Sequence, residues 1–176
     1  TLNLSTLAAF VAATAGLCVA KHGNRSVTSQ CGSADFIEAL GLPLQEDPES
    51  VTAALQQKRF AFLFAPFFHA ATARVSQVRR SLGIRTIFNL LGPLTNPAQP
   101  RAGLIGCAFD DLAPVLARAF AERGSSVLVV RGDDGLDEIT TTTTSSVWQV
   151  VDGTVTELTI DPSDLGIDYV DDVRSE

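Results

Sequence analysis

Lys21, His22 and Asn24 place a cation, an imidazole and a carboxamide within four residues of one another, in the stretch KHGNR. The apolar residues 17–20 precede this stretch and predict a short buried strand. Ligands of α/β proteins gather at the carboxyl ends of strands. We therefore expect residues 21–29 to leave the strand at a place where a substrate can bind.

A helix is predicted directly after this polar loop. Ser33 is a candidate N-cap for a helix over residues 34–40, with Gly41 as its stop. Because a helix N-terminus offers free N–H groups to an anion, a phosphate could lie between this helix and Lys21. The same spacing also fits an ordinary strand, polar loop and capped helix that bind nothing.

Asp137 and Glu138 form a second candidate site. They lie in a polar loop that Gly132 and Gly135 make easy to bend. Adjacent carboxylates on irregular backbone can bind a hard cation such as Mg²⁺, which takes its other ligands from water and phosphate oxygens. Taken alone, such a stretch is more often a solvated turn.

Composition sets wider bounds on the function. The chain has 176 residues, of which 45% are apolar, so it can bury a core as one domain or as parts of two. Thirteen basic against twenty acidic residues disfavour a nucleic-acid partner, although a local basic patch remains compatible with this balance. Three cysteines without CxxC spacing are typical of a cytoplasmic protein, and no apolar stretch is long enough to predict a membrane span.

The hydrophobic pattern predicts an α/β fold. We expect a mostly parallel sheet flanked by helices, with an antiparallel hairpin added to it, because Asp152-Gly153 separates two strand patterns. Helices are predicted from a cap at Asn3 or Ser5 to residue 15, after Asp47, and over residues 70–82 and 111–123. Strands are predicted over residues 102–108, 126–130, 147–151 and 154–160. The threonines of residues 140–144 favour an extended segment, and the acidic tail from Asp161 is expected to be loosely ordered.

Four motifs occur together and in order: KHGNR at 21–25, GSAD at 32–35, VRRSLGIRTIFNLLGPLTNPA at 78–98 and GLDE at 135–138. Jointly they closely resemble anthranilate phosphoribosyltransferase, a transferase family of tryptophan biosynthesis. The resemblance implies transfer of the phosphoribosyl group from phosphoribosyl pyrophosphate to the amine of anthranilate, with release of pyrophosphate. It implies no catalytic acid or base, because orientation and electrostatic stabilisation suffice for this reaction.

The resemblance also implies the site residues. Anthranilate would be bound by Asn24, Arg79 and His22. Phosphoribosyl pyrophosphate would be bound by Asn3, Ser5, Thr6, Lys21 and Ser33. The cofactor Mg²⁺ would be held by Ser5, Asp137 and Glu138. Arg80 is expected to be a solvated neighbour of Arg79, and His69 to be a structural histidine.

The family has a large α/β domain and a small helical domain. By resemblance, residues 1–67 and 92–176 are parts of the large domain, and residues 68–91 belong with the helical one. The chain is expected to be an internal fragment, inactive alone, of a homodimeric cytoplasmic parent. It departs from the family pattern at residues 70–74 and by lacking a glycine within the threonine run, which affects the details of the anthranilate pocket and the metal loop.

Two other functions stay open on the sequence. A nucleic-acid-binding relative of the same fold would lack the transferase activity, and the acidic charge and intact motifs count against it. A pyrimidine nucleoside phosphorylase would share the architecture and use phosphate and a base. Its phosphate-binding signature is rich in lysine and serine, unlike residues 21–24.

Overall fold

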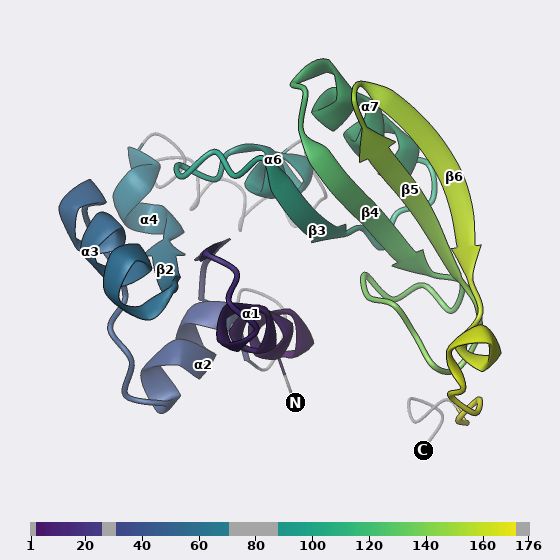
Figure 1. The fold of residues 1–176 in the computed structure, drawn as a ribbon, viewed down its shortest axis with the longest axis horizontal. Coiled ribbons are helices and arrows are strands. Elements are labelled where there is room, and N and C mark those ends of the chain that lie inside the picture. The colour runs from purple at the N-terminus through teal and green to yellow at the C-terminus, as the bar shows by residue number, and fades with distance from the viewer. Residues whose placement is uncertain (1–2, 26–30, 71–87, 172–176) are drawn as a thin grey trace, which may run out of the picture. The chain divides into compact units, whose positions relative to one another are not determined.

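The computed structural model describes residues 3–25, 31–70 and 88–171. The chain divides into two compact units, Thr1–Gln99 and Pro100–Glu176, and each is described by itself. Figure 1 labels the elements in chain order. Within the residues described, no helix combines the length and the apolar character that crossing a membrane requires.

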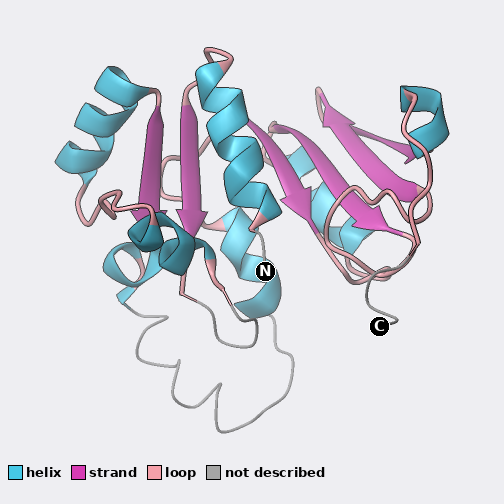
Figure 2. Ribbon diagram, turned by 90° about the horizontal axis from the view of Figure 1, so that it is seen from below, coloured by secondary structure: helices cyan, strands magenta, loops and turns pink. Residues whose placement is uncertain are grey.

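The first unit is built on two parallel strands, β1 (Val19–Gly23) and β2 (Phe60–Phe64). Their register runs from Val19 opposite Phe60 to Gly23 opposite Phe64, and Figure 2 shows the two strands side by side. Because side chains alternate across a strand, each strand sends its odd and even positions to opposite faces. The two faces are covered by different helices.

One face packs on α1 (Leu4–Thr14) and α2 (Ser33–Ala39), and the other on α3 (Pro48–Lys58). The core under the first two helices consists of Ala34, Ile37, Phe62 and Phe64, with Phe10 packed against it. The core under α3 consists of Val51, Ala61 and Leu63, with Phe68 packed against it. Within the aromatic run of residues 60–68, Phe62 is fully buried in this core, whereas Phe67 is 49% exposed.

Two predicted N-caps are confirmed, and one is wrong. The side chain of Asn3 caps α1, and the carboxylate of Asp47 accepts hydrogen bonds from the backbone N–H groups of Glu49 and Ser50 at the start of α3. Ser33 is not the N-cap of α2, because Gly32 holds that position and its N–H donates to the Asp35 carboxylate at 2.9 Å. Ser33 is instead the first helical residue.

The predicted strand over residues 17–20 is also misplaced. Leu17 is 63% exposed, and β1 begins at Val19 and includes Lys21, His22 and Gly23, which we expected in the loop. Pairing with the apolar strand β2 extends β1 through these polar residues, so that the strand rather than a loop presents their side chains.

The second unit contains a four-stranded sheet in the order β3-β4-β5-β6 and the helix α7. The elements are β3 (Ala102–Gly106), α7 (Ala113–Glu122), β4 (Ser126–Gly132), β5 (Ser145–Val151) and β6 (Thr154–Ile160). Strands β3 and β4 are parallel, whereas β4–β5 and β5–β6 are antiparallel. The predicted α/β class with an added hairpin is confirmed. A mostly parallel sheet was expected, whereas parallel and antiparallel pairings are equally frequent among the described strands, because β5 also pairs antiparallel with β4.

Helix α7 packs on the sheet through Ala113, Leu116, Ala117 and Phe120, which are buried, whereas Val115 is 44% exposed. The helix begins at Ala113 rather than at residue 111, with Pro114 in its first turn, where a missing N–H costs no intrahelical bond. Directly opposed residues of β4 and β5 supply further buried side chains: Val127 and Val150, and Val129 and Trp148.

The predicted hairpin turn is confirmed by its backbone. Asp152 and Gly153 both have positive φ, 49° and 74°, as a two-residue turn of type I′ requires. The acidic tail is ordered as far as it is described, because Pro162–Leu165 form a short 3₁₀ helix capped by Asp161. The threonine run bends instead of forming the expected extended segment, and the site geometry below gives the reason.

In the part of the first unit that follows β2, the structure describes residues 65–70 and 88–99. The predicted helix over residues 70–82 lies, except for its first residue, outside the described residues. Two short helices flank it, α4 (Ala65–Phe68) and α6 (Phe88–Leu94). The Asn96 side chain after α6 donates to the Ala20 carbonyl of β1 at 2.9 Å and ties this end of the segment to the first sheet.

Gly106, the last residue of β3, generates a testable prediction about stability. A Cβ at this position would lie 1.8 Å from the carbonyl oxygen of Asp137, so Gly106→Ala forces the backbone of that loop to move. We expect a loss of about 2–3 kcal/mol in the free energy of unfolding, measured by urea denaturation. Gly103→Ala is the control, because its Cβ would make ordinary contacts at 3.7 Å. Equal losses of unfolding free energy for the two variants would show that the loop around Asp137 moves away from residue 106 without a measurable cost.

Candidate functional site

A polar cluster lies at the N-terminus of α1. The side-chain oxygen of Asn3 accepts from the backbone N–H of Thr6 at 3.1 Å, from its hydroxyl at 2.6 Å and from the Ser5 hydroxyl at 3.2 Å. Lys21 Nζ donates to the Ser5 hydroxyl at 3.0 Å. A positive charge, two hydroxyls and the positive end of a helix dipole therefore meet at one point, which is a favourable arrangement for an anion.

The alternation of β1 separates Lys21 from His22. Lys21 is paired with Phe62, whose side chain belongs to the core under α1 and α2, so the lysine is directed to the first turn of α1. His22 is paired with Leu63 and is directed to the opposite face. Lys21 therefore donates a hydrogen bond to the first turn of α1, whereas we expect it from the sequence to lie near the N-terminus of α2.

Asn24 and Ser33 come together at the end of β1. The carbonyl of Asn24 accepts from the Ala34 N–H at 3.2 Å and from the Ser33 hydroxyl at 3.4 Å. The close approach depends on Gly23, because a Cβ there would lie 2.2 Å from Ser33 Oγ and 3.0 Å from the Phe62 ring. The first turn of α2 therefore rests directly on the strand end.

Arg25 holds the chain as it leaves the strand. Its guanidinium makes a bidentate ion pair with Glu38 of α2, lies 3.6 Å from the Asp35 carboxylate and stacks 5.5 Å from the centre of the Phe64 ring. The planar donor fork of arginine suits this combination of carboxylate and ring contacts. Arg25 is therefore engaged in supporting the loop that carries Asn24.

His22 and His69 form an imidazole pair. Their Nε2 atoms are 3.1 Å apart and the rings meet edge to face, with 5.0 Å between ring centres. The pKa of His22 falls from 6.5 to about 4, because burial and then the neighbouring His69 disfavour its charged form, whereas a hydrogen bond with the backbone of Gly92 favours it. His22 is therefore neutral at pH 7.

His69 had been expected to be structural, and nothing in its sequence context pointed to His22. The signal that could have found it is topological. Strands β1 and β2 are parallel, so the residues that follow or end them meet at the same edge of the sheet. His69 follows β2 through the single turn of α4.

The acidic pair lies in the second unit, in the loop that follows β4, as predicted. Asp137 is exposed and Glu138 is half-buried. The loop is closed by backbone hydrogen bonds from Gly132 N to the Leu136 carbonyl at 2.9 Å and from Gly135 N to the Gly132 carbonyl at 2.8 Å. Among the residues described, no group of three or more potential metal-ligating His, Cys, Asp or Glu side chains occurs, so a cation here needs ligands beyond this loop.

The sequence-predicted residues thus fall into separate groups. Asn3, Ser5, Thr6 and Lys21 form one cluster, and Asn24 lies with Ser33 at the end of β1. His22 is on the other face of the strand. Asp137 and Glu138 belong to the second unit, and Arg79 lies outside the described residues.

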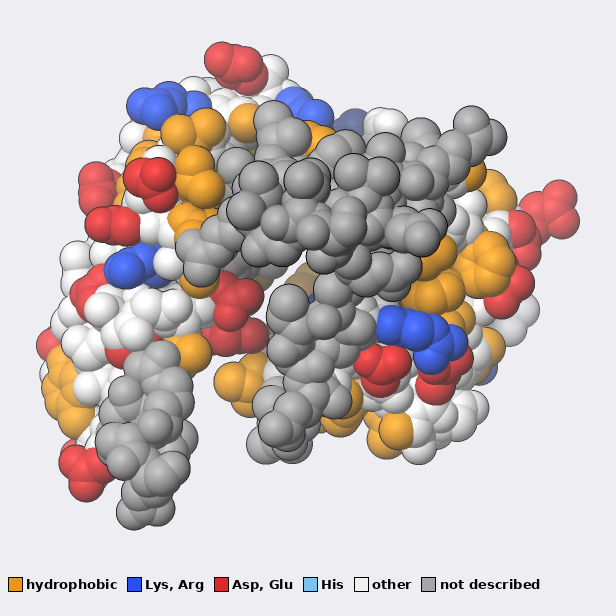
Figure 3. Space-filling view, turned by 180° about the vertical axis from the view of Figure 1, so that it is seen from behind, with side chains coloured by type: hydrophobic (Ala, Val, Ile, Leu, Met, Phe, Trp, Pro, Cys, Tyr) orange, Lys and Arg blue, Asp and Glu red, His pale blue; other side chains and the backbone are white. Residues whose placement is uncertain are grey.

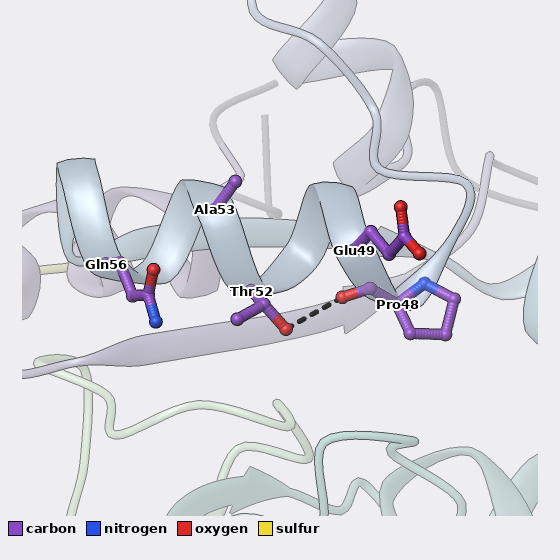
Figure 4. A pocket seen from close by; sticks show the side chains of 5 residues that line it. All are labelled: Pro48, Glu49, Thr52, Ala53 and Gln56. Atoms are coloured by element: carbon purple, nitrogen blue, oxygen red, sulfur yellow. Dashed lines mark hydrogen bonds between the residues drawn. The ribbon is translucent and has the colours of Figure 1, made fainter.

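A shallow hollow of about 380 Å³ beside α3 is not part of these groups. Figure 4 shows that its five lining side chains all come from this one helix, and the Thr52 hydroxyl is already bonded to the Pro48 carbonyl at 2.8 Å. Among the described residues on the face in Figure 3, Lys and Arg side chains lie between Asp and Glu side chains and form no continuous basic patch.

The histidine pair generates a prediction about protonation. Between pH 6.5 and about 4, the unfolded chain binds a proton on His22 that the folded chain does not bind. Above pH 6.5 His22 is neutral in both states and does not lower the free energy of unfolding. As the pH falls from 6.5 toward 4, protonation of the unfolded chain lowers that free energy. In an NMR titration of the folded protein, His22 should titrate near pH 4. His69→Phe should raise the pKa but keep it below 6.5, since burial is the larger cause; a midpoint near 6.5 in the unmodified chain would contradict the assignment.

Comparison with known proteins identifies relatives along nearly the whole chain. Residues 1–174 match the family model described as glycosyl transferase family, a/b domain. The anthranilate phosphoribosyltransferase of Mycobacterium ulcerans (strain Agy99) is 58% identical over 166 residues, which are 94% of this chain and 45% of that protein. The chain therefore spans about half the length of the curated relatives that it matches.

Solved structures agree with the sequence comparison. Anthranilate phosphoribosyltransferase from Thermus thermophilus superposes with a TM-score of 0.86 at 44% identity, covering 96% of this chain and 50% of that one. The Saccharomyces cerevisiae enzyme in complex with PRPP and Mg gives a TM-score of 0.85 at 36% identity, covering 97% and 47%. With a family match over residues 1–174, the chain belongs to the glycosyl transferase family, as its a/b domain.

Proposed function

We propose that the protein carrying this chain transfers the phosphoribosyl group of phosphoribosyl pyrophosphate to anthranilate, giving N-(5-phosphoribosyl)anthranilate and pyrophosphate. The observation that carries the proposal is 58% identity to an anthranilate phosphoribosyltransferase over 94% of the chain. The polar cluster at α1, the end of β1 and the acidic loop supply side chains of the types that this reaction needs.

The cluster at α1 is our proposed site for phosphoribosyl pyrophosphate. It combines Lys21, the Ser5 and Thr6 hydroxyls and a helix N-terminus, all of which favour a polyanion. Asn3 holds both hydroxyls in place through its side-chain oxygen. We assign Ser33, at the start of α2, to the same substrate.

Asp137, Glu138 and Ser5 are our proposed ligands for Mg²⁺. The donor set consists only of hard oxygen atoms, and the exposed Asp137 carboxylate is open to solvent, so the residues fit this cation. Ser5 accepts a hydrogen bond from Lys21, and its oxygen becomes available to a cation once the lysine turns to a phosphate. Bound Mg²⁺ would neutralise negative charge that grows on the leaving pyrophosphate.

Asn24 and His22 are our proposed contacts for anthranilate, together with Arg79. Among the described residues, Asn24 Oδ1 accepts one hydrogen bond, from the Arg25 N–H at 2.8 Å, and a carboxamide oxygen has a second lone pair with which to accept from the arylamine. That contact would orient the nitrogen lone pair toward the sugar carbon. A neutral His22 lines the pocket without adding positive charge near a carbon that becomes cationic during the transfer.

The chemistry required of the protein is then positioning and charge stabilisation. Lys21 and the N-terminus of α1 favour the departing anion, and the anthranilate contacts hold the neutral amine beside the sugar carbon. No described side chain has to remove a proton before attack, because an arylamine is already a nucleophile. The lowered pKa of His22, about 4, makes its imidazole a weak base, in agreement with a site that positions the amine and does not deprotonate it.

We also propose that residues 68–91 belong with a small helical domain and residues 1–67 and 92–176 with the large domain of a cytoplasmic homodimer. The support is the resemblance of the motifs and the similarity to known anthranilate phosphoribosyltransferases. The acidic formal charge of −7 and the mixed charges in Figure 3 favour small-molecule substrates over a nucleic-acid partner.

The longest natural chain that carries residues 1–176, called the full natural chain below, allows a direct test. Mixing it with Mg²⁺, phosphoribosyl pyrophosphate and anthranilate should cause loss of anthranilate fluorescence. Phosphate-dependent cleavage of a pyrimidine nucleoside would support a phosphorylase instead. Binding of nucleic acid without either reaction would support a non-enzymatic relative.

The acidic loop generates a prediction about metal dependence. In the full natural chain, Asp137→Asn with Glu138→Gln should abolish Mg²⁺-dependent turnover, because amides keep the shape but lose the charge that holds a hard cation. Circular dichroism should be unchanged. Asp152→Asn with Glu157→Gln removes the same charge from the β5–β6 hairpin and should leave turnover intact. Normal activity of the first variant across a Mg²⁺ series would mean that the pair is merely solvated.

Arg79 and Arg80 generate a prediction about substrate selectivity. Arg79→Ala should weaken anthranilate binding by about 10- to 100-fold and phosphoribosyl pyrophosphate binding far less, since a charge-assisted hydrogen bond contributes roughly 1.5–3 kcal/mol. Arg80→Ala is the matched control and should change neither. Separate titrations of the two substrates measure both effects, and equal losses for both in Arg79→Ala would remove the assignment.

A further inference from the structure

The threonine run has no role in the function proposed above, yet two of its hydroxyls bind the same carboxylate. Thr140 Oγ1 donates to Asp134 Oδ2 at 2.7 Å, and Thr142 Oγ1 donates to the same oxygen. The other oxygen of Asp134 accepts from the Leu136 N–H at 3.0 Å. The Asp134 carboxylate, which lies between β4 and the acidic pair in the sequence, therefore accepts hydrogen bonds at both of its oxygens.

The threonines are themselves fixed to the sheet. Thr140 is 4% exposed, and its N–H donates to the hydroxyl of fully buried Ser145, the first residue of β5, at 3.0 Å. The Thr142 N–H donates to Thr140 Oγ1 at 3.1 Å, so the backbone of the run turns back toward the Thr140 hydroxyl. This explains why the run bends where its β-branched residues favoured an extended segment.

The two sides of the acidic pair are therefore connected through Asp134. Asp134 and Leu136 precede the pair, whereas Thr140 and Thr142 follow it, and the carboxylate bonds to both sides. Gly132 lets this carboxylate approach the strand end, because a Cβ there would lie 2.5 Å from Asp134 Oδ1. The intervening residues 137–139 are thereby held as a closed loop.

We propose that Asp134, bound by the hydroxyls of Thr140 and Thr142, is a positioning residue that fixes the loop carrying Asp137 and Glu138. The inference rests on the proposed function in that the fixed loop presents the pair to Mg²⁺. Groups that orient metal ligands from outside the coordination shell typically change metal affinity by about 10- to 100-fold when they are removed. A comparable effect is expected when the clasp formed by Asp134, Thr140 and Thr142 is broken.

The test replaces hydroxyls by methyl groups of the same shape in the full natural chain. Thr140→Val with Thr142→Val breaks the clasp, and Thr143→Val, where no hydroxyl bond occurs in the described structure, is the matched control. Thr142→Val alone is the second variant, because Thr142 is only half-buried and its change spares the core. Thr140→Ser with Thr142→Ser restores both hydroxyls.

The first readout is hydrogen exchange of residues 133–139 without metal, followed by mass spectrometry. The double valine variant should exchange about tenfold faster, since the loop loses its internal bonds, whereas Thr143→Val and the serine variant should match the unmodified chain. The second readout is turnover as a function of Mg²⁺. The concentration for half-maximal rate should rise about 10-fold or more, and kcat at saturating Mg²⁺ should change far less.

Two results would overturn the inference while leaving the proposed function intact. One is unchanged exchange in both valine variants. The other is faster exchange with an unaltered Mg²⁺ requirement, when the Asp137→Asn, Glu138→Gln variant has lost its Mg²⁺-dependent turnover. Normal Mg²⁺ dependence in that amide variant would instead overturn the metal assignment, and this inference with it.

Discussion

The parallel pairing of β1 with β2 is the constraint on which the first unit depends. It draws Lys21 and His22 into a strand despite their polarity, and it fixes the phase of side-chain alternation from Val19 to Gly23. The lysine is thereby directed to the first turn of α1 and the histidine to His69. A shift of the register by one residue would exchange the two faces and leave both groups without their partners.

The second unit uses its carboxylates in two different ways. Asp133 and Asp134 accept hydrogen bonds from hydroxyls of the following segment, including Ser146 at 3.0 Å, and so serve the loop itself. Asp137 is exposed and its backbone rests against Gly106. The same short stretch of chain therefore contains acids that shape the loop and, at Asp137, a carboxylate that is exposed to solvent. The carboxylates of Asp133 and Asp134 are occupied because they accept hydrogen bonds from hydroxyl groups of Ser146 and Thr140.

Much of this arrangement could be predicted from local sequence signals. Caps at Asn3 and Asp47, the parallel unit and the Asp152-Gly153 hairpin follow from rules that involve only a few neighbouring residues. The start of β1 and the bend of the threonine run could not be predicted, because a partner outside the local pattern decides each one: strand β2 extends β1, and the Asp134 carboxylate accepts hydrogen bonds from the threonines. The same limit hid the contact between His22 and His69. The cap of α2 is within reach of local rules, because Asp35 lies only three residues after Gly32, but serine is a common N-cap and the pattern favours Ser33.

Gly23 has a consequence for anyone who wishes to redesign this protein. Between a polar strand and the first turn of α2, it leaves no room for even a methyl group beside Ser33 and Phe62. Libraries that vary the end of β1 should therefore leave this position unrandomised. Diversity belongs at Asn24, which is exposed and follows Gly23 directly.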